Sequence, residues 1–164
     1  MLGLMQSQPL LISSLIEFAA RHHGDGEIVS RRVEGDIHRY TYRDLAARAR
    51  RLANALDAMP LQLGERVASL AWNGYRHMEM YFGVSGSGRV LHTINPRLHP
   101  DQIAWVMNHA EDQVLCFETS FLPLVQAVYQ KCPMVKKWVM LCDADKLPAD
   151  TGIAGLVSYE EWIS

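Results

Sequence analysis

Seven histidines and three cysteines are the side chains of this 164-residue sequence best suited to bind a metal or attack a substrate. Zinc sites need these residues at short, regular spacings such as H-E-x-x-H or repeated C-x-x-C, and neither pattern occurs. No serine lies in the G-x-S-x-G motif of hydrolases. The histidines are therefore interpreted as scattered surface residues or hydrogen-bonded core residues: His22, His23, His38, His77, His92, His99 and His109.

Residues 83–88, Gly-Val-Ser-Gly-Ser-Gly, form the segment most similar to a phosphate-binding loop. Such a loop needs free backbone amides at the start of a helix. Here the glycines follow an expected helix, so they are interpreted as a helix stop and a tight turn. The acidic pairs 111–112 and 143/145 fall in expected loops, where solvation is a simpler interpretation than metal binding or proton sharing. Residue chemistry alone indicates no catalytic constellation.

Composition excludes several classes of protein. Sixteen basic and eighteen acidic residues give a net charge of −2, which argues against a dedicated nucleic-acid binder. The hydrophobic share of 49% and charged share of 21% are typical of a folded protein. No apolar run approaches the ~18 residues of a transmembrane helix. Three scattered cysteines, Cys116, Cys132 and Cys142, favour a reduced, cytoplasmic setting.

The first third of the chain predicts two helices around a hairpin. Residues 9–22 carry an apolar stripe at helical spacing, formed by Leu11, Leu15, Phe18 and His22. Residues 27–33 and 37–41 read as strands joined by a Gly-Asp turn. Thr41 and Asp44 form a capping box before a second stripe, Leu45, Ala49, Leu52, Leu56 and Met59. The arginines beside that stripe are interpreted as a solvated face: Arg43, Arg48, Arg50 and Arg51.

From residue 66 onward, strands alternate with helices. Strands are expected at 66–72, 90–94, 113–118 and 137–142. Asn73 and Ser120 are expected to cap two of the helices between them, and Pro100 is expected in the first turn of a third. Such alternation predicts an α/β fold of βαβ units, with a largely parallel sheet flanked by helices and a small N-terminal hairpin. Strand order stays open.

A second capping box, Ser158 to Glu161, predicts the start of a helix, but the sequence stops at Ser164. A helix so short cannot offset its nucleation cost. We therefore expect residues 1–164 to be a single fragment, the opening portion of a larger domain.

Four segments, in order, resemble the adenylate-forming enzymes, the superfamily of acyl-CoA synthetases, luciferases and peptide-synthetase adenylation modules. Residues 40–45 resemble their T-Y-x-E-L helix start, and residues 64–68 with Trp72-Asn73 resemble their G-D-R-V-A…N strand. Residues 91–98, Leu-His-Thr-Ile-Asn-Pro-Arg-Leu, are similar to their N-P-R-L segment, and residues 102–116 follow as expected. The resemblance covers about residues 10–163 and is greatest to bacterial medium- or long-chain fatty-acyl-CoA synthetases.

This resemblance implies an enzyme that uses ATP and Mg²⁺ to activate a fatty acid as an acyl-adenylate and then transfers it to CoA. The family's phosphate loop and Tyr-x-x-Thr-Glu motif match nothing in residues 1–164, so this part of the large N-terminal domain is expected to be an inactive scaffold that binds no cofactor tightly. The resemblance implies a role for one residue of this sequence. Arg97, in Asn-Pro-Arg, would approach the phosphates of CoA. The alternative is a surface arginine, or one paired with Asp101.

Two other functions stay open. The chain could be a stand-alone α/β interaction or regulatory module derived from that scaffold, or a small nucleotide-binding domain unrelated to ligases. A homo-oligomer is a further expectation, because an apolar arm precedes the first helix and could cover a partner subunit: Met1, Leu2, Leu4, Met5, Leu10 and Leu11.

Overall fold

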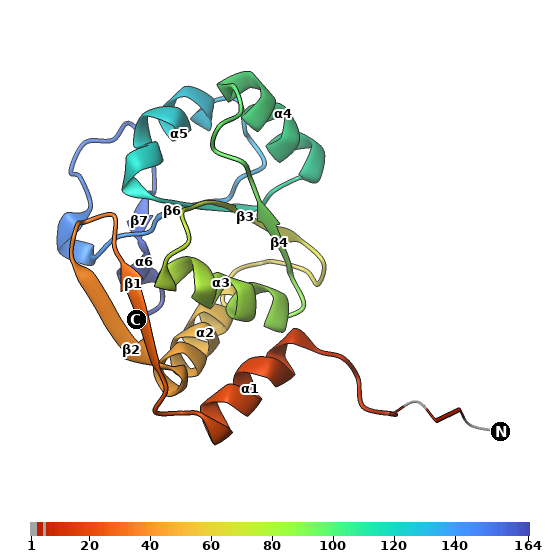
Figure 1. The fold of residues 1–164 in the computed structure, drawn as a ribbon. Coiled ribbons are helices and arrows are strands. Elements are labelled where there is room, and N and C mark those ends of the chain that lie inside the picture. Colours follow the sequence, from red (N-terminus) through yellow and green to blue (C-terminus); the bar gives the residue numbers. More distant parts are fainter. Residues whose placement is uncertain (1–2, 5) are drawn as a thin grey trace.

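A parallel sheet lies at the centre of the computed structural model, which describes residues 3–4 and 6–164 (Figure 1). Its strands are β3 (Arg66–Leu70), β4 (Val90–Thr93), β5 (Val114–Phe117), β6 (Lys137–Met140) and β7 (Val157–Ser158). They lie in the order β4-β3-β5-β6-β7, and every neighbouring pair is parallel. The predicted α/β class is confirmed. Since β4 lies on one side of β3 and β5 on the other, the direction of winding reverses between β3 and β5.

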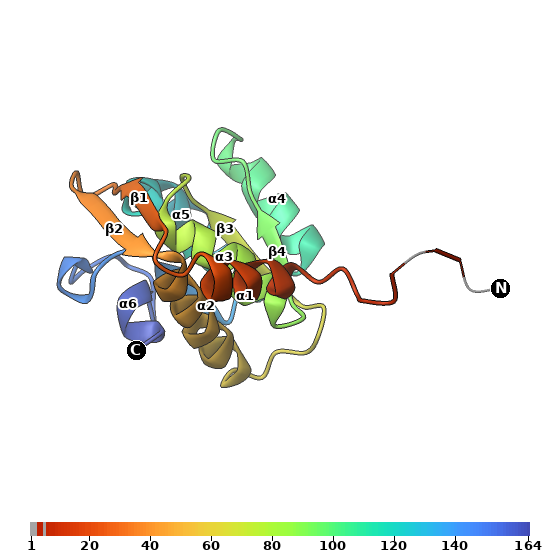
Figure 2. The same cartoon turned by 60° about the horizontal axis from the view of Figure 1, so that its bottom comes forward.

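Helices cover both faces of this sheet (Figures 1 and 2). One face carries α4 (Pro100–Ala110) and α5 (Leu122–Tyr129), and the other carries α2 (Tyr42–Asp57), α3 (Tyr75–Gly86) and the short α6 (Tyr159–Trp162). Strand β5 shows why both faces are buried. Leu115 and Phe117 pack with α4 and α5, whereas Val114 and Cys116 pack with α2 and α3. A strand covered on both faces reads as a continuous apolar run.

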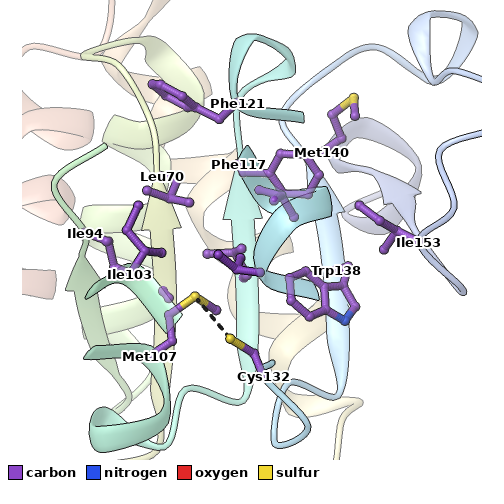
Figure 3. Packing of buried hydrophobic residues seen from close by; sticks show 14 of the residues in the cluster. Leu70, Ile94, Ile103, Met107, Phe117, Phe121, Cys132, Trp138, Met140 and Ile153 are labelled. Carbon is purple, nitrogen blue, oxygen red and sulfur yellow. Dashed lines mark hydrogen bonds between the residues drawn. The ribbon is translucent and has the colours of Figure 1, made fainter. Parts of the chain in front are cut away.

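The core between the sheet, α4 and α5 is shown in Figure 3. Phe117 and Met140 point from the strands toward this layer, and Ile103 and Met107 come from α4. The Cys132 thiol lies 3.9 Å from the sulfur of Met107, and all three cysteines are buried and free. Within residues 3–4 and 6–164, no helix combines the length and apolar character needed to cross a bilayer.

The hairpin and the cap of α2 follow the local sequence closely. Strand β1 (Glu27–Arg31) pairs antiparallel with β2 (Ile37–Thr41), and Gly35 takes a φ of 103° in the turn. Such a φ favours glycine because it has no Cβ. The Thr41 hydroxyl accepts from the Asp44 backbone N–H, and the Asp44 carboxylate accepts from the Thr41 N–H, so the predicted capping box is confirmed.

Helix α1 (Ile12–His22) buries a different face from the predicted one. The stripe of Leu11, Leu15 and Phe18 is more than half exposed, whereas Ile16 is buried. The inward side is completed by Ala19 and Ala20. Alanines let α1 approach the rest of the fold closely, so small residues decide its orientation and the bulky stripe remains outside. The predicted stripe is therefore wrong as a core face.

Two predicted helix caps are also wrong. Asn73 does not cap α3, whose N-cap is Gly74 and has no side-chain cap bond. Ser120 lies inside a 3-10 turn, Thr119–Phe121, that precedes α5, and its hydroxyl accepts from Trp72 Nε1 at 3.1 Å. Both residues instead belong to the loops beyond the carboxyl ends of β3 and β5, which the bond between Trp72 and Ser120 joins.

Helices α2 and α3 pack closely at Gly83. A Cβ added there would lie 2.7 Å from the Ala49 carbonyl oxygen and 2.9 Å from Leu52 Cδ2. The helix stop and tight turn predicted for residues 83–88 are confirmed, since α3 ends at Gly86 and Gly88 takes a φ of 78° in the turn that follows. The glycines there serve packing and turning.

We expect Gly83→Ala to lower the free energy of unfolding by about 1–3 kcal/mol, because overpacking exceeds the helix-propensity gain of about 1 kcal/mol. Urea denaturation would measure the change. Gly86→Ala is the matched control, since its added Cβ would meet only Ser13 Cβ at an ordinary 3.6 Å. Equal losses for both variants would contradict the packing argument.

Candidate functional site

A small cavity lies beyond the carboxyl ends of β3 and β5, where the winding of the sheet reverses. Open α/β sheets bind ligands at this kind of position. The hairpin end supplies Arg32 and Glu34, the β3–α3 connection supplies Trp72, the first turn of α3 supplies Arg76, and Glu118 follows β5 directly. We call this the carboxyl-edge cavity. Its volume is about 30 Å³, which is room for one or two water-sized groups and not for a nucleotide.

Arg76, in the first turn of α3, connects several segments beside this cavity through hydrogen bonds. Its side chain is 4% exposed and donates to Glu160 Oε1 at 2.8 Å, Glu34 Oε1 at 2.9 Å and the Leu141 carbonyl at 3.0 Å. It also donates to the Asp143 carboxylate. One guanidinium thus joins the hairpin, the loop after β6 and α6, which explains why a charged group is tolerated in the interior.

Arg48, a partly buried arginine of α2, extends the network. Arg48 Nε donates to Glu79 Oε1 at 2.7 Å, and Arg48 Nη2 donates to Glu160 at 3.0 Å. The Tyr159 hydroxyl donates to the other oxygen of Glu79 at 2.9 Å. Burial raises the pKa of Glu79, and the hydrogen bond from Arg48 opposes that rise. These contacts attach α6 to α2 and α3.

Glu118 differs from the other buried acids. It is 5% exposed, and its carboxyl group makes no hydrogen bond to any residue in the described part of the chain. Burial raises the pKa of Glu118 to about 7, with Arg76 lowering it and Glu34 adding to the rise. A carboxyl group with a raised pKa therefore lies at the switch point of the sheet.

Arg97 lies elsewhere, in the loop between β4 and α4. Its backbone N–H donates to Asn95 Oδ1 at 3.0 Å, so Asn95 sets the turn as the sequence predicts. The Arg97 side chain is exposed. The alternative pairing with Asp101 is wrong, because that carboxylate accepts from Lys131 Nζ at 2.6 Å.

Several charged residues interpreted as solvated are in fact paired. Arg48 is not on a solvated face, whereas Arg43 is 64% exposed as predicted. Asp112 is buried and accepts from His92 Nδ1 at 2.9 Å. Asp143 accepts from Arg32 at 2.9 Å as well as from Arg76. The described residues contain no group of three or more His, Cys, Asp or Glu able to hold a metal ion.

Sequence reasoning missed Arg76, Glu118 and Glu160. A signal existed for Glu118, because a charged residue directly after the buried run Val114–Phe117 must lie at the carboxyl edge of the sheet. No local signal marks the partners of Arg76. Glu34, Asp143 and Glu160 are distant from it in sequence, and only the fold brings them together.

Comparisons with known proteins agree on one family. The model of a family described as "AMP-binding enzyme" matches residues 16–161. The chain is 48% identical to the 3-methylmercaptopropionyl-CoA ligase of Ruegeria lacuscaerulensis, over 99% of this chain and 30% of the relative. It is 44% identical to the medium-chain-fatty-acid–CoA ligase of Ectopseudomonas oleovorans, with the same two coverages.

A solved structure shows the same fold. The acetoacetyl-CoA synthetase of Streptomyces lividans superposes with a TM-score of 0.79 at 15% identity, covering 93% of this chain and 24% of that one. The chain thus spans about 30% of the length of the two curated relatives.

Proposed function

Because this chain belongs to the AMP-binding enzyme family, we propose that residues 1–164 are the first part of the large N-terminal domain of an ATP-dependent acyl-CoA ligase. The observation that carries the proposal is 44–48% identity to two CoA ligases of which the chain spans about 30%. Membership of this family excludes a nucleotide-binding domain unrelated to ligases. The complete polypeptide would convert a carboxylate and ATP to an acyl-adenylate and pyrophosphate, and then form a thioester with CoA in the cytoplasm.

Within such an enzyme, these residues would act as a scaffold. The residues that the structure describes offer no cluster of three metal-binding side chains, and the carboxyl-edge cavity is too small for an adenylate. The carboxyl-edge cavity therefore does not fit a nucleotide, and the described residues offer no all-protein metal site of three such side chains. ATP and Mg²⁺ would be bound by residues outside this chain.

We expect the 164-residue protein to show no ATP–pyrophosphate exchange above background with octanoate or palmitate. A complete ligase of the family, assayed in parallel, is the positive control. Exchange by the 164 residues alone would refute the assignment of catalysis to residues outside them.

Arg97 is the residue of this chain proposed to contact CoA. The turn fixed by Asn95 presents the arginine on an exposed loop, and its guanidinium makes no hydrogen bond or ion pair to the residues described. A free guanidinium presents a fork of N–H donors that matches phosphate oxygens. Neighbouring Asp101 does not compete, because it is bound to Lys131.

In a polypeptide long enough to be active, we expect Arg97→Ala to raise the KM for CoA about 10-fold or more, since a hydrogen bond to a charged group contributes about 1.5–3 kcal/mol. The KM for ATP should not change. The control is Arg39→Ala, which removes an exposed arginine paired with Glu27 on the hairpin. An unchanged KM for CoA in Arg97→Ala would contradict the role.

For the acyl substrate we propose a medium- or long-chain fatty acid, which the relative from E. oleovorans supports. A short thioether acid is the second candidate, favoured by the relative at 48% identity. Comparing kcat/KM for octanoate, palmitate and 3-methylmercaptopropionate would distinguish the two candidate substrates. A preference of at least tenfold for the thioether acid would overturn the first candidate.

A homo-oligomer and a stand-alone module remain proposals. Leu4, Leu10 and Leu11 of the apolar arm are exposed, whereas Met1, Leu2 and Met5 lie outside the described residues. Light scattering before and after deletion of residues 1–8 tests the oligomer, since an unchanged mass would remove the idea. A monomer that unfolds cooperatively would favour the module.

A further inference from the structure

One edge of β1 has no backbone partner. At the two ends of the hairpin ladder, the Tyr42 N–H donates to the Gly26 carbonyl and the Arg32 N–H donates to the Asp36 carbonyl. Because antiparallel ladders alternate between bonded and non-bonded pairs, the even-numbered residues of β1 bond to β2. The odd-numbered residues therefore turn their N–H and C=O groups away from β2, and these residues are Glu27, Val29 and Arg31.

This free edge of β1 is open to a further strand. Its three outward-bonding residues are exposed, and within the described chain their backbone groups make no bond outside the hairpin. A groove of about 320 Å³ separates β1 from α3, with Ile28, Met78 and Tyr81 among the residues that line it (Figure 1). An exposed row of unpaired N–H and C=O groups is a template for pairing with another strand.

The sequence of β1 is complementary to a second, antiparallel copy of itself. In the register of full overlap, Val29 faces Val29, and Glu27 of each copy faces Arg31 of the other. The odd-numbered residues of both copies then meet, and these are the residues whose backbone groups point outward. Charge complementarity and backbone hydrogen bonding therefore select the same register.

Both charged residues are available for these pairs. Glu27 Oε2 accepts from Arg39 of its own chain at 2.7 Å, and Glu27 Oε1 makes no hydrogen bond within the described residues. Arg31 is exposed and forms no ion pair with the part of the chain that the structure describes. A second copy would give Arg31 a carboxylate partner.

The other edge of the hairpin does not match itself in this way. Full antiparallel overlap of β2 with a second β2 places Arg39 directly opposite Arg39. Like charges that face each other across two strands destabilise the pairing. The hairpin thus favours a second copy at β1 and disfavours one at β2.

We propose that two copies of this chain associate by antiparallel pairing of β1 with β1, which gives a four-stranded sheet in the order β2-β1-β1-β2. Ile28 and Ser30 of each copy lie on the inner face of the hairpin, the side on which α3 packs. The interface uses neither the apolar arm nor the ligase chemistry, so its failure would leave the proposed function standing.

Sedimentation equilibrium of the 164-residue protein tests the association. The mass should rise from one chain to two with concentration, and a single-chain mass at millimolar concentration would overturn the proposal. Arg31→Glu should raise the dissociation constant about tenfold or more, because two attractive charge pairs become repulsive. The matched control is Lys136→Glu, the same charge change at an exposed residue before β6, which should leave the dissociation constant unchanged. Equal effects of the two variants would overturn the proposal.

Exchange of the two charges tests the register. Glu27→Arg should weaken the dimer as Arg31→Glu does, and the double variant should regain the dissociation constant of the parent. A mixture of the two single variants should form heterodimers, because every charge then meets its opposite in the partner. A double variant as weak as the single ones, or a mixture that stays monomeric, would overturn the proposed pairing.

Amide hydrogen exchange tests which backbone groups become covered. The Val29 N–H should exchange about tenfold or more slowly as the dimer forms, whereas the Arg39 N–H, on the outer edge of β2, should exchange at one rate at all concentrations. Protection of Arg39 without Val29 would overturn the proposal. Protection of Val29 in a monomeric polypeptide extended past Ser164 would assign the edge to a later strand and overturn it as well.

Discussion

Arg76→Met is expected to lower the free energy of unfolding by about 3–5 kcal/mol, because removing one partner of a buried ion pair leaves uncompensated charge. Three carboxylates, on Glu34, Asp143 and Glu160, would lose their shared donor, and the Leu141 carbonyl would lose its hydrogen bond. Methionine keeps the volume of the stem, so the loss reports charge and not a cavity. Urea denaturation followed by circular dichroism would measure it.

Arg43→Met is the matched control on the surface. Arg43 is 64% exposed and pairs with Asp25, which is 88% exposed, so its removal should cost less than about 1 kcal/mol. Arg76→Lys should fall between the two variants, because an ammonium keeps the charge but cannot serve four acceptors in a plane. Equal midpoints for Arg76→Met and Arg43→Met would show that the buried network does not stabilise the fold.

The second large effect is a pH dependence centred on Glu118. Its folded pKa of about 7 lies above the ordinary glutamate value of 4.5 because the group is buried. A raised pKa means that the folded state binds the proton more tightly than the unfolded state. The contribution to stability is therefore fully present below about pH 4.5 and is lost as the pH rises through about 7.

Glu118→Gln removes this dependence because glutamine stays neutral. Relative to the parent, the variant should become more stable by up to about 3 kcal/mol between pH 4.5 and 7.5, at about 1.4 kcal/mol for each unit of pKa shift. Urea midpoints at both pH values would give the difference. A gap that stays constant with pH would show that burial does not raise the pKa of Glu118.

Local patterns in the sequence were enough to predict most of the fold. The capping box at Thr41 needs only a neighbour three residues away, and the hairpin turn needs only the φ that Gly35 adopts. Unbroken apolar runs predict buried strands such as Val114–Phe117. These features depend on neighbours, so a single sequence contains the information that fixes them.

Features that depend on distant partners could not be predicted. Arg48 looks like any helix-surface arginine until α3 and α6 bring Glu79 and Glu160 to it. Helix α1 turns its bulky stripe outward because its alanine side fits the rest of the fold, and no property of α1 alone reveals that choice. The carboxyl-edge cavity likewise exists only where the hairpin meets the loops after β3 and β5.

The order in which the chain is synthesised gives the ion network a further consequence. Arg48 emerges from the ribosome 112 residues before Glu160, and Arg76 emerges 84 residues before it. At a synthesis rate of about 5–20 residues per second, Glu160, the second carboxylate partner of Arg48, is added roughly 6–22 seconds after Arg48. Until then the nascent hairpin, α2 and α3 lack the clamp that α6 supplies. A ribosome that pauses before codon 160 would therefore hold a chain open to proteases and to chaperones.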